Sequence, residues 1–115
     1  MRVRHTLQRL VSAAVALLPA WLTPGWDVEY VEDLPDRPKR KRVYVLGTKQ
    51  APFQAVMPCP CGCGEMIWLD LETGQEEHWQ ILSDRPGNAT LIPSIWKTDG
   101  CGSHYWLTRG RIKWC

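Results

Sequence analysis

The sequence predicts a small, mostly β fold of the α+β class: an antiparallel sheet of short hairpins, a zinc site that joins two turns, and one N-terminal helix. Three observations predict it. Short stretches of alternating apolar and polar residues begin at residue 27, all five cysteines follow residue 58, and an apolar stretch with helical spacing precedes the strands. The 115 residues, with a formal net charge of +2, make one small domain, which excludes most large enzyme folds.

Residues 1–26 differ from the rest of the chain. Three arginines precede an apolar stretch that ends near two prolines, which is the outline of a signal peptide. Apolar residues at helical spacing favour an amphipathic helix instead; they are Leu7, Leu10, Val11, Ala14, Leu17, Leu18 and Trp21. Such a helix would dock on the domain or a partner, or contact a membrane surface through residues 7–22. Because export would place the thiols in oxidising surroundings, we expect a cytoplasmic protein.

Residues 27–115 form the predicted zinc-binding β domain. Turn residues divide the stretches 65–82 and 104–115, so each of them predicts a hairpin. Five tryptophans, at positions 68, 79, 96, 106 and 114, fall one to a strand, and we interpret them as the core of a thin sheet. Strands are expected at 27–31, 43–46, 53–57, 65–71, 78–82, 90–92, 95–96, 104–107 and 111–115.

A basic run, residues 37–42, follows several acidic residues. Such a run could contact phosphate, and together with the cations of 109–113 it would suit a nucleic-acid-binding ribbon. We favour a solvated loop that the preceding acids partly neutralise. We therefore expect no nucleic-acid partner.

Cysteines and one histidine form two short clusters. The first is Cys59-Pro-Cys61-Gly-Cys63 and the second is Cys101-Gly-Ser-His104, each with glycines that allow a tight turn. Three cysteines this close together cannot pair with one another without strain, whereas zinc takes four thiolate or imidazole ligands, usually from two turns. The sequence therefore predicts a zinc ion bound by residues of these two clusters.

Six groups are candidates for four ligand positions, because Cys115 also carries a thiol. One surplus group could be a buried free thiol. Alternatively, only three groups bind and a water completes a catalytic zinc site. We favour a closed, structural site.

Two serines are candidate catalytic residues. Ser103 directly precedes His104, and Ser94 follows Pro93 at a strand break. Either hydroxyl could be an ordinary turn group. Alternatively, it could lie beside a metal or an imidazole, where its proton can be removed, and attack a substrate. Glu65, directly after the first cluster, could act as a general base on zinc-bound water, although a solvent-facing strand position is the simpler interpretation.

With both clusters described, residues 27–115 resemble a family of small bacterial proteins whose genes lie beside those for ubiquitin-like modifiers and their activating and conjugating enzymes. The specific motifs are Cys59-Pro-Cys-Gly-Cys-Gly-Glu65 and Gly100-Cys-Gly-Ser-His-Tyr105; weaker matches lie at 28–35, 43–47, 91–96 and 110–115. The resemblance implies a metal-binding accessory hydrolase, a peptidase that trims the modifier or releases it from targets. Its partners would be the modifier and the conjugating machinery.

Two functions remain open at this point. A hydrolase could bind an extended modifier tail as an added strand at an exposed sheet edge beside the metal. Ser94, Ser103 or a zinc-bound water would then attack the bond. The alternative is a non-catalytic, zinc-stabilised adaptor that binds the modifier or its conjugating enzyme.

Overall fold

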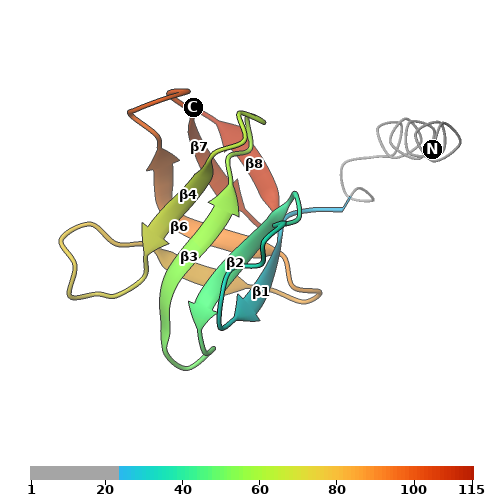
Figure 1. The fold of residues 1–115 in the computed structure, drawn as a ribbon, viewed down its shortest axis with the longest axis vertical. Coiled ribbons are helices and arrows are strands. Elements are labelled where there is room, and N and C mark those ends of the chain that lie inside the picture. Colours follow the sequence, from blue (N-terminus) through green and yellow to red (C-terminus); the bar gives the residue numbers. More distant parts are fainter. Residues whose placement is uncertain (1–23) are drawn as a thin grey trace, which may run out of the picture.

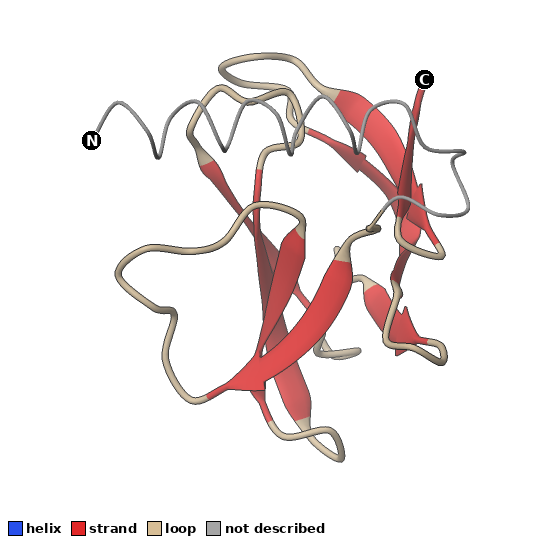
Figure 2. Ribbon diagram, turned by 90° about the vertical axis from the view of Figure 1, so that its right-hand side faces the viewer, coloured by secondary structure: helices blue, strands red, loops and turns tan. Residues whose placement is uncertain are grey.

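The computed structural model describes residues 24–115, which form two four-stranded β-sheets (Figure 1). The first sheet has the order β1 (Asp27–Val31), β2 (Arg42–Gly47), β3 (Pro52–Pro58) and β4 (Met66–Asp70). The second has the order β5 (Gln80–Ser83), β6 (Ala89–Trp96), β7 (His104–Thr108) and β8 (Arg111–Trp114). Only strands and loops occur in this part of the chain, as Figure 2 shows.

The expected fold class is therefore wrong. The described residues are all-β rather than α+β, their strands form two sheets rather than one, and β1 pairs with β2 in parallel. The helix predicted within 1–26 lies almost entirely outside the described residues. Over residues 24–115, no helix is long and apolar enough to cross a bilayer.

The predicted hairpin at 65–82 is also wrong. β4 pairs with β3, whereas β5 pairs with β6 in the other sheet. Alternation identifies a strand and its buried face, but it does not identify the neighbouring strand. The hairpin at 104–115 is confirmed: β7 and β8 pair in an antiparallel manner, and the two turn residues, Arg109 and Gly110, both have positive φ, as in a type I′ turn.

The core lies between the two sheets and consists of alternate side chains from their facing sides. It contains Val43 and Val45 of β2, Ala55 and Met57 of β3, Ile67 and Leu69 of β4, Ala89, Leu91 and Ile95 of β6, and Tyr105 and Leu107 of β7. The Tyr105 hydroxyl is fully buried and donates a hydrogen bond across the core to the Met57 sulfur, 3.6 Å away. This burial raises the pKa of Tyr105.

The segment before β1 connects the two sheets at one end. The Trp26 N–H donates to the Gly110 carbonyl (2.9 Å), and the Trp26 carbonyl accepts from the Ala89 N–H (2.9 Å). Gly110 packs tightly here: a Cβ at this position would lie 2.9 Å from Asn88 Oδ1 and 3.1 Å from the Trp26 carbonyl oxygen. Glycine is therefore required at this junction.

The end of the basic run is engaged within the domain. The Arg42 guanidinium forms ion pairs with Asp27 (2.9 Å) and Glu29 (2.8 Å) on the neighbouring strand β1. Hydrogen bonds to Asp27 raise the pKa of Arg42. Acidic residues of 27–42 thus neutralise one cation of the run directly.

Candidate functional site

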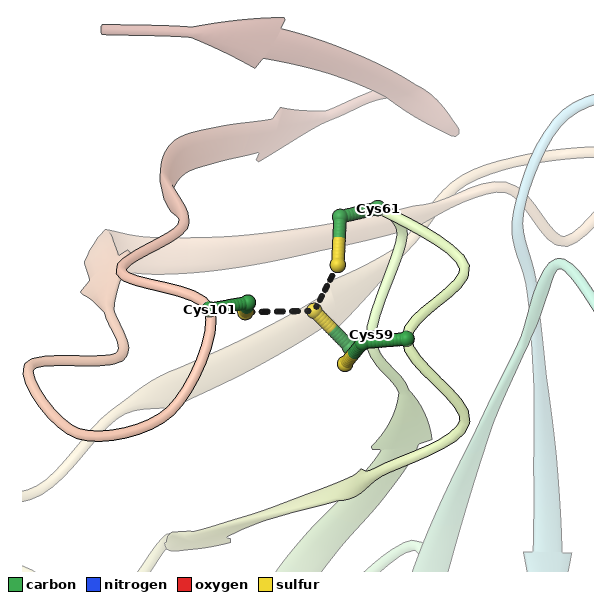
Figure 3. A group of neighbouring side chains, drawn as sticks. Cys59, Cys61 and Cys101 are labelled. Carbon is green, nitrogen blue, oxygen red and sulfur yellow. Dashed lines mark hydrogen bonds between the residues drawn. The ribbon is translucent and has the colours of Figure 1, made fainter.

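Four cysteine sulfurs meet where the β3–β4 loop faces the β6–β7 loop. Figure 3 shows three of these residues, Cys59, Cys61 and Cys101. Cys59, Cys61 and Cys63 belong to the first loop and Cys101 to the second, and all four sulfurs lie within 4.8 Å of one another. The Cys59 sulfur is 3.3 Å from that of Cys61 and 3.6 Å from that of Cys101. Tetrahedral zinc at about 2.3 Å from each thiolate places sulfurs about 3.8 Å apart. The four thiols could therefore hold one metal ion.

The chain reverses direction tightly to bring the first three thiols together. The Cys59 N–H donates to the Glu65 carbonyl (2.8 Å), and the Gly62 N–H donates back to the Cys59 carbonyl (3.1 Å). Gly62 and Gly64 have φ of +86° and +88°, a conformation that other residues rarely adopt. Gly62, between two of the cysteines, and Gly64, directly after the third, thus allow the loop to present three sulfurs on one side.

The protein environment shifts the pKa values of these thiols in opposite directions. Burial raises the pKa of Cys59 to about 12. Hydrogen bonds from Ser103 lower the pKa of Cys101 to about 6, and a hydrogen bond from Cys59 lowers the pKa of Cys61. Thiolates at the cluster are the form that a metal ion binds. The thiolate form is therefore favoured at Cys61 and Cys101, whereas the pKa of Cys63, like that of Cys59, is raised.

Ser103, one of the two candidate nucleophiles, belongs to this cluster. Its side chain is 8% exposed, and its hydroxyl lies 3.1 Å from the Cys101 sulfur and 3.7 Å from the Cys59 sulfur. Glu65, the candidate base, instead forms an ion pair with Lys97 (2.6 Å) and raises the pKa of that amine.

His104 and Ser94 contact each other. His104 Nε2 lies 3.1 Å from Ser94 Oγ, so that the serine hydroxyl can donate to it when the imidazole proton is on Nδ1. The predicted ligand His104 is not among the four clustered groups, and neither is Cys115, whose N–H donates to the His104 carbonyl (3.0 Å). The indole of Trp96 stacks on the imidazole, with ring centroids 5.3 Å apart and an interplanar angle of 19°.

The strand register explains this meeting. Trp96 pairs with His104 across β6 and β7, and Ser94 shares the face of Trp96 because it is two residues away. Between the pairs that flank Ser94, three residues of β6 face a single residue of β7, so the strand bulges. Bulges redirect side chains and are common beside active sites. The Trp79 indole N–H donates to the Ser94 carbonyl (3.3 Å) and ties this bulge to the loop before β5.

Ser94 opens onto a groove of about 380 Å³. Residues 94–99 form one wall of the groove, residues 66–69 of β4 form the other, and Glu77 and Trp79 also line it. A second cleft, of about 400 Å³, lies beside Cys59 and Trp114 and does not include Ser94. The groove is therefore where a substrate could reach the serine hydroxyl.

The sequence indicated Ser94, Ser103 and His104 as candidate site residues but did not indicate that Ser94 contacts His104. The Cys-x-x-His spacing predicted that His104 is a metal ligand together with Cys101. Trp96 was interpreted as a core residue, yet its side chain is exposed and stacks on His104. The signal that could have indicated the pairing is alternation, because Ser94 and Trp96 occupy the face opposite the buried Ile95.

A hydroxyl that could act as a nucleophile, that of Ser94, lies beside an imidazole that could act as its general base, that of His104, and the two residues belong to neighbouring strands. Among residues 24–115 no carboxylate forms a hydrogen bond with the His104 ring. Neither the curated proteins nor the solved structures that were compared include a match to this chain. A family model described as bacterial ubiquitination-like system serine protease (BubE) matches residues 30–115. The chain therefore belongs to the BubE family of serine proteases of bacterial ubiquitination-like systems.

Proposed function

We propose that this BubE-family protein cleaves the peptide bond that follows a ubiquitin-like modifier, in a precursor or in a conjugate, with Ser94 as nucleophile and His104 as general base. The observation that carries the proposal is the 3.1 Å contact between Ser94 Oγ and His104 Nε2. The family description supports a protease role in such a system. The modifier and its conjugating machinery are the proposed partners.

The proposed reaction is acyl transfer in two steps. Ser94 Oγ attacks the scissile carbonyl carbon while Nε2 of His104 takes the hydroxyl proton, and the protonated imidazole then gives this proton to the leaving amine as the C–N bond breaks. Water subsequently attacks the acyl-serine while His104 accepts a proton from this water, and the imidazolium then returns this proton to Ser94 Oγ as the ester C–O bond breaks. The products are a free amine and the carboxyl terminus of the modifier.

In this proposal Trp96 orients the imidazole of His104. A carboxylate usually holds the imidazole of a serine protease and stabilises its charged form. Here the indole face stacks on the ring (5.3 Å) and can stabilise the imidazolium by a cation–π interaction. Trp96 is therefore a positioning residue for His104.

The four clustered cysteines are proposed to bind zinc as a closed, structural site. Four thiolates fill a tetrahedral zinc, which leaves no position for a water, and a bound ion would supply folding free energy. The hydroxyl of Ser103 contacts the Cys101 sulfur (3.1 Å), and Ser103 directly precedes His104 in the sequence. In this arrangement the cluster fixes the loop from which His104 enters β7.

The test is cleavage of a fusion in which a ubiquitin-like modifier of such a bacterial system carries a short C-terminal extension. We expect Ser94→Ala and His104→Gln to lose about 10⁴-fold or more in kcat, because each removes a group required for attack. Ser83→Ala, on the exposed part of β5, is the matched control and should cleave normally. A fluorophosphonate probe should label the wild type at Ser94 and leave Ser94→Ala unlabelled.

Other outcomes would assign the function differently. Cleavage that persists in Ser94→Ala and is lost in Ser103→Ala, with zinc retained, would make Ser103 the nucleophile and overturn the proposal. Tight binding of the fusion without cleavage by the wild type would favour the adaptor.

A further inference from the structure

We infer that the free edge of β4 binds the substrate as an added β-strand, so that an extended, unfolded segment of polypeptide lies in the groove between β4 and Ser94. This inference rests on the proposed function, because it assigns the substrate class of the same site. The occupant is the flexible segment that contains the scissile bond, and the edge recognises it through the main chain.

The register of β4 shows which of its backbone groups face the groove. The Cys59 N–H donates to the Glu65 carbonyl and the Leu71 N–H donates to the Phe53 carbonyl, at the two ends of the β3–β4 pairing. Backbone groups along an antiparallel strand alternate between its two sides. Those of Ile67 and Leu69 therefore face β3, whereas those of Met66, Trp68 and Asp70 face the opposite edge.

One of these outward groups is already bound. The Asp70 carbonyl accepts a hydrogen bond from the Trp79 N–H (2.8 Å), as a neighbouring strand would donate it. Beyond that point, Met66 and Trp68 present N–H and C=O groups along the wall of the groove. An unpaired edge is a ready template for another chain, and proteins use it to bind extended peptides.

The two ends of the groove fix its position relative to Ser94. At one end, Glu65 beside β4 forms an ion pair with Lys97 beside β6 (2.6 Å). At the other end, Trp79 donates its backbone N–H to the Asp70 carbonyl and its indole N–H to the Ser94 carbonyl (3.3 Å). β4 and the part of β6 that carries Ser94 therefore flank the same groove. A strand paired with β4 there would lie beside the serine hydroxyl.

A main-chain template predicts which substrates are accepted. It requires consecutive extended residues with free N–H groups, because alternate residues of an added strand point their N–H groups at the edge. A helix or a folded sheet cannot present such a row. The tail of a modifier fulfils this requirement, whereas its folded part does not.

The test uses the wild-type protein and synthetic peptides that span the cleavage junction of the fusion. One backbone amide at a time is N-methylated, residue by residue on both sides of the scissile bond. We expect about a three- to tenfold loss of kcat/KM at alternate positions and little loss at the positions between, since one hydrogen bond is lost each time. Losses without this period of two would overturn the inference.

Two substitutions test the same edge from the side of the protein. Trp68→Pro removes an N–H that faces the groove and no hydrogen bond to β3, whereas Trp68→Ala removes the ring and keeps the N–H. We expect kcat/KM to be about three- to tenfold lower in Trp68→Pro than in Trp68→Ala, mainly through KM. Equal values in two folded variants would contradict the inference.

Failure of the inference differs from failure of the proposed function. If β4 does not bind the substrate, the fluorophosphonate probe still labels Ser94, and cleavage shows no alternation. If Ser94 is not the nucleophile, labelling and cleavage no longer depend on it, whatever the peptides show.

Discussion

Loss of the proposed zinc ion should destabilise the domain more than any single change in its core. Structural zinc contributes about 10–16 kcal/mol in small zinc-finger peptides, whereas a domain of this size has a net stability of about 5–14 kcal/mol. The four sulfurs join two loops that are far apart in the sequence, and Cys59 is only 5% exposed. Even if only about 3 kcal/mol is lost, the melting temperature should fall by about 12 °C or more.

The perturbation is Cys59→Ser, with Cys115→Ser as the matched control. Both remove one thiol, but only Cys59 belongs to the four-sulfur cluster. Elemental analysis should find one zinc per chain in the wild type and in Cys115→Ser, and little in Cys59→Ser. Thermal unfolding followed by tryptophan fluorescence, with and without a chelator, gives the shift. A metal-free wild type, or a chelator that leaves its melting temperature unchanged, would refute the reasoning.

Three further predictions concern single side chains. Trp96→Ala should lower kcat about three- to tenfold, because the ring that stacks on His104 is lost, whereas Trp96→Phe should keep much of the activity; equal losses in both would exclude an orienting stack. Gly110→Ala should lower the free energy of unfolding by about 2 kcal/mol or more in urea, since its φ is +78° and a Cβ would lie 2.9 Å from Asn88 Oδ1; an unchanged midpoint would contradict this. Burial raises the pKa of Tyr105, so the unfolded chain loses this proton first, and stability should fall as pH rises above about 10. In Tyr105→Phe, the free energy of unfolding from urea titrations should fall less between pH 8 and 10.5 than in the wild type. An equal fall in the two proteins would count against this prediction.

Local features of the fold could be predicted from the sequence because they depend on neighbouring residues. Alternation indicated a strand at β1, apolar segments separated by Gly47 and Pro52 indicated strands close to β2 and β3, and a short turn between strands indicated the β7–β8 hairpin. The assignment of strands to sheets could not be predicted in this way. No residue pattern between 71 and 79 indicates that the chain passes from one sheet to the other. The sheet that each strand joins depends on core contacts among β3, β4, β6 and β7.

The candidate site divides in a similar manner. The glycines among the cysteines indicate tight turns, and the structure brings four sulfurs together from both clusters. The pairing of Ser94 with His104 depends on β7 lying beside β6 in this register, and alternation within β6 does not identify the neighbouring strand. The position of Ser94 beside Pro93 did indicate an irregular strand, and a bulge is what turns an ordinary strand residue toward a neighbouring imidazole.

The loop between Ser94 and His104 has a consequence for newly made protein. Cys101 lies in this loop, and its sulfur meets those of residues 59–63, which belong to the other sheet. The pairing of β6 with β7 holds the two proposed reactive groups on neighbouring strands, and the contact between the two loops adds a constraint that reaches across both sheets. The full set of contacts around the proposed reactive groups would therefore be complete only after both sheets have assembled.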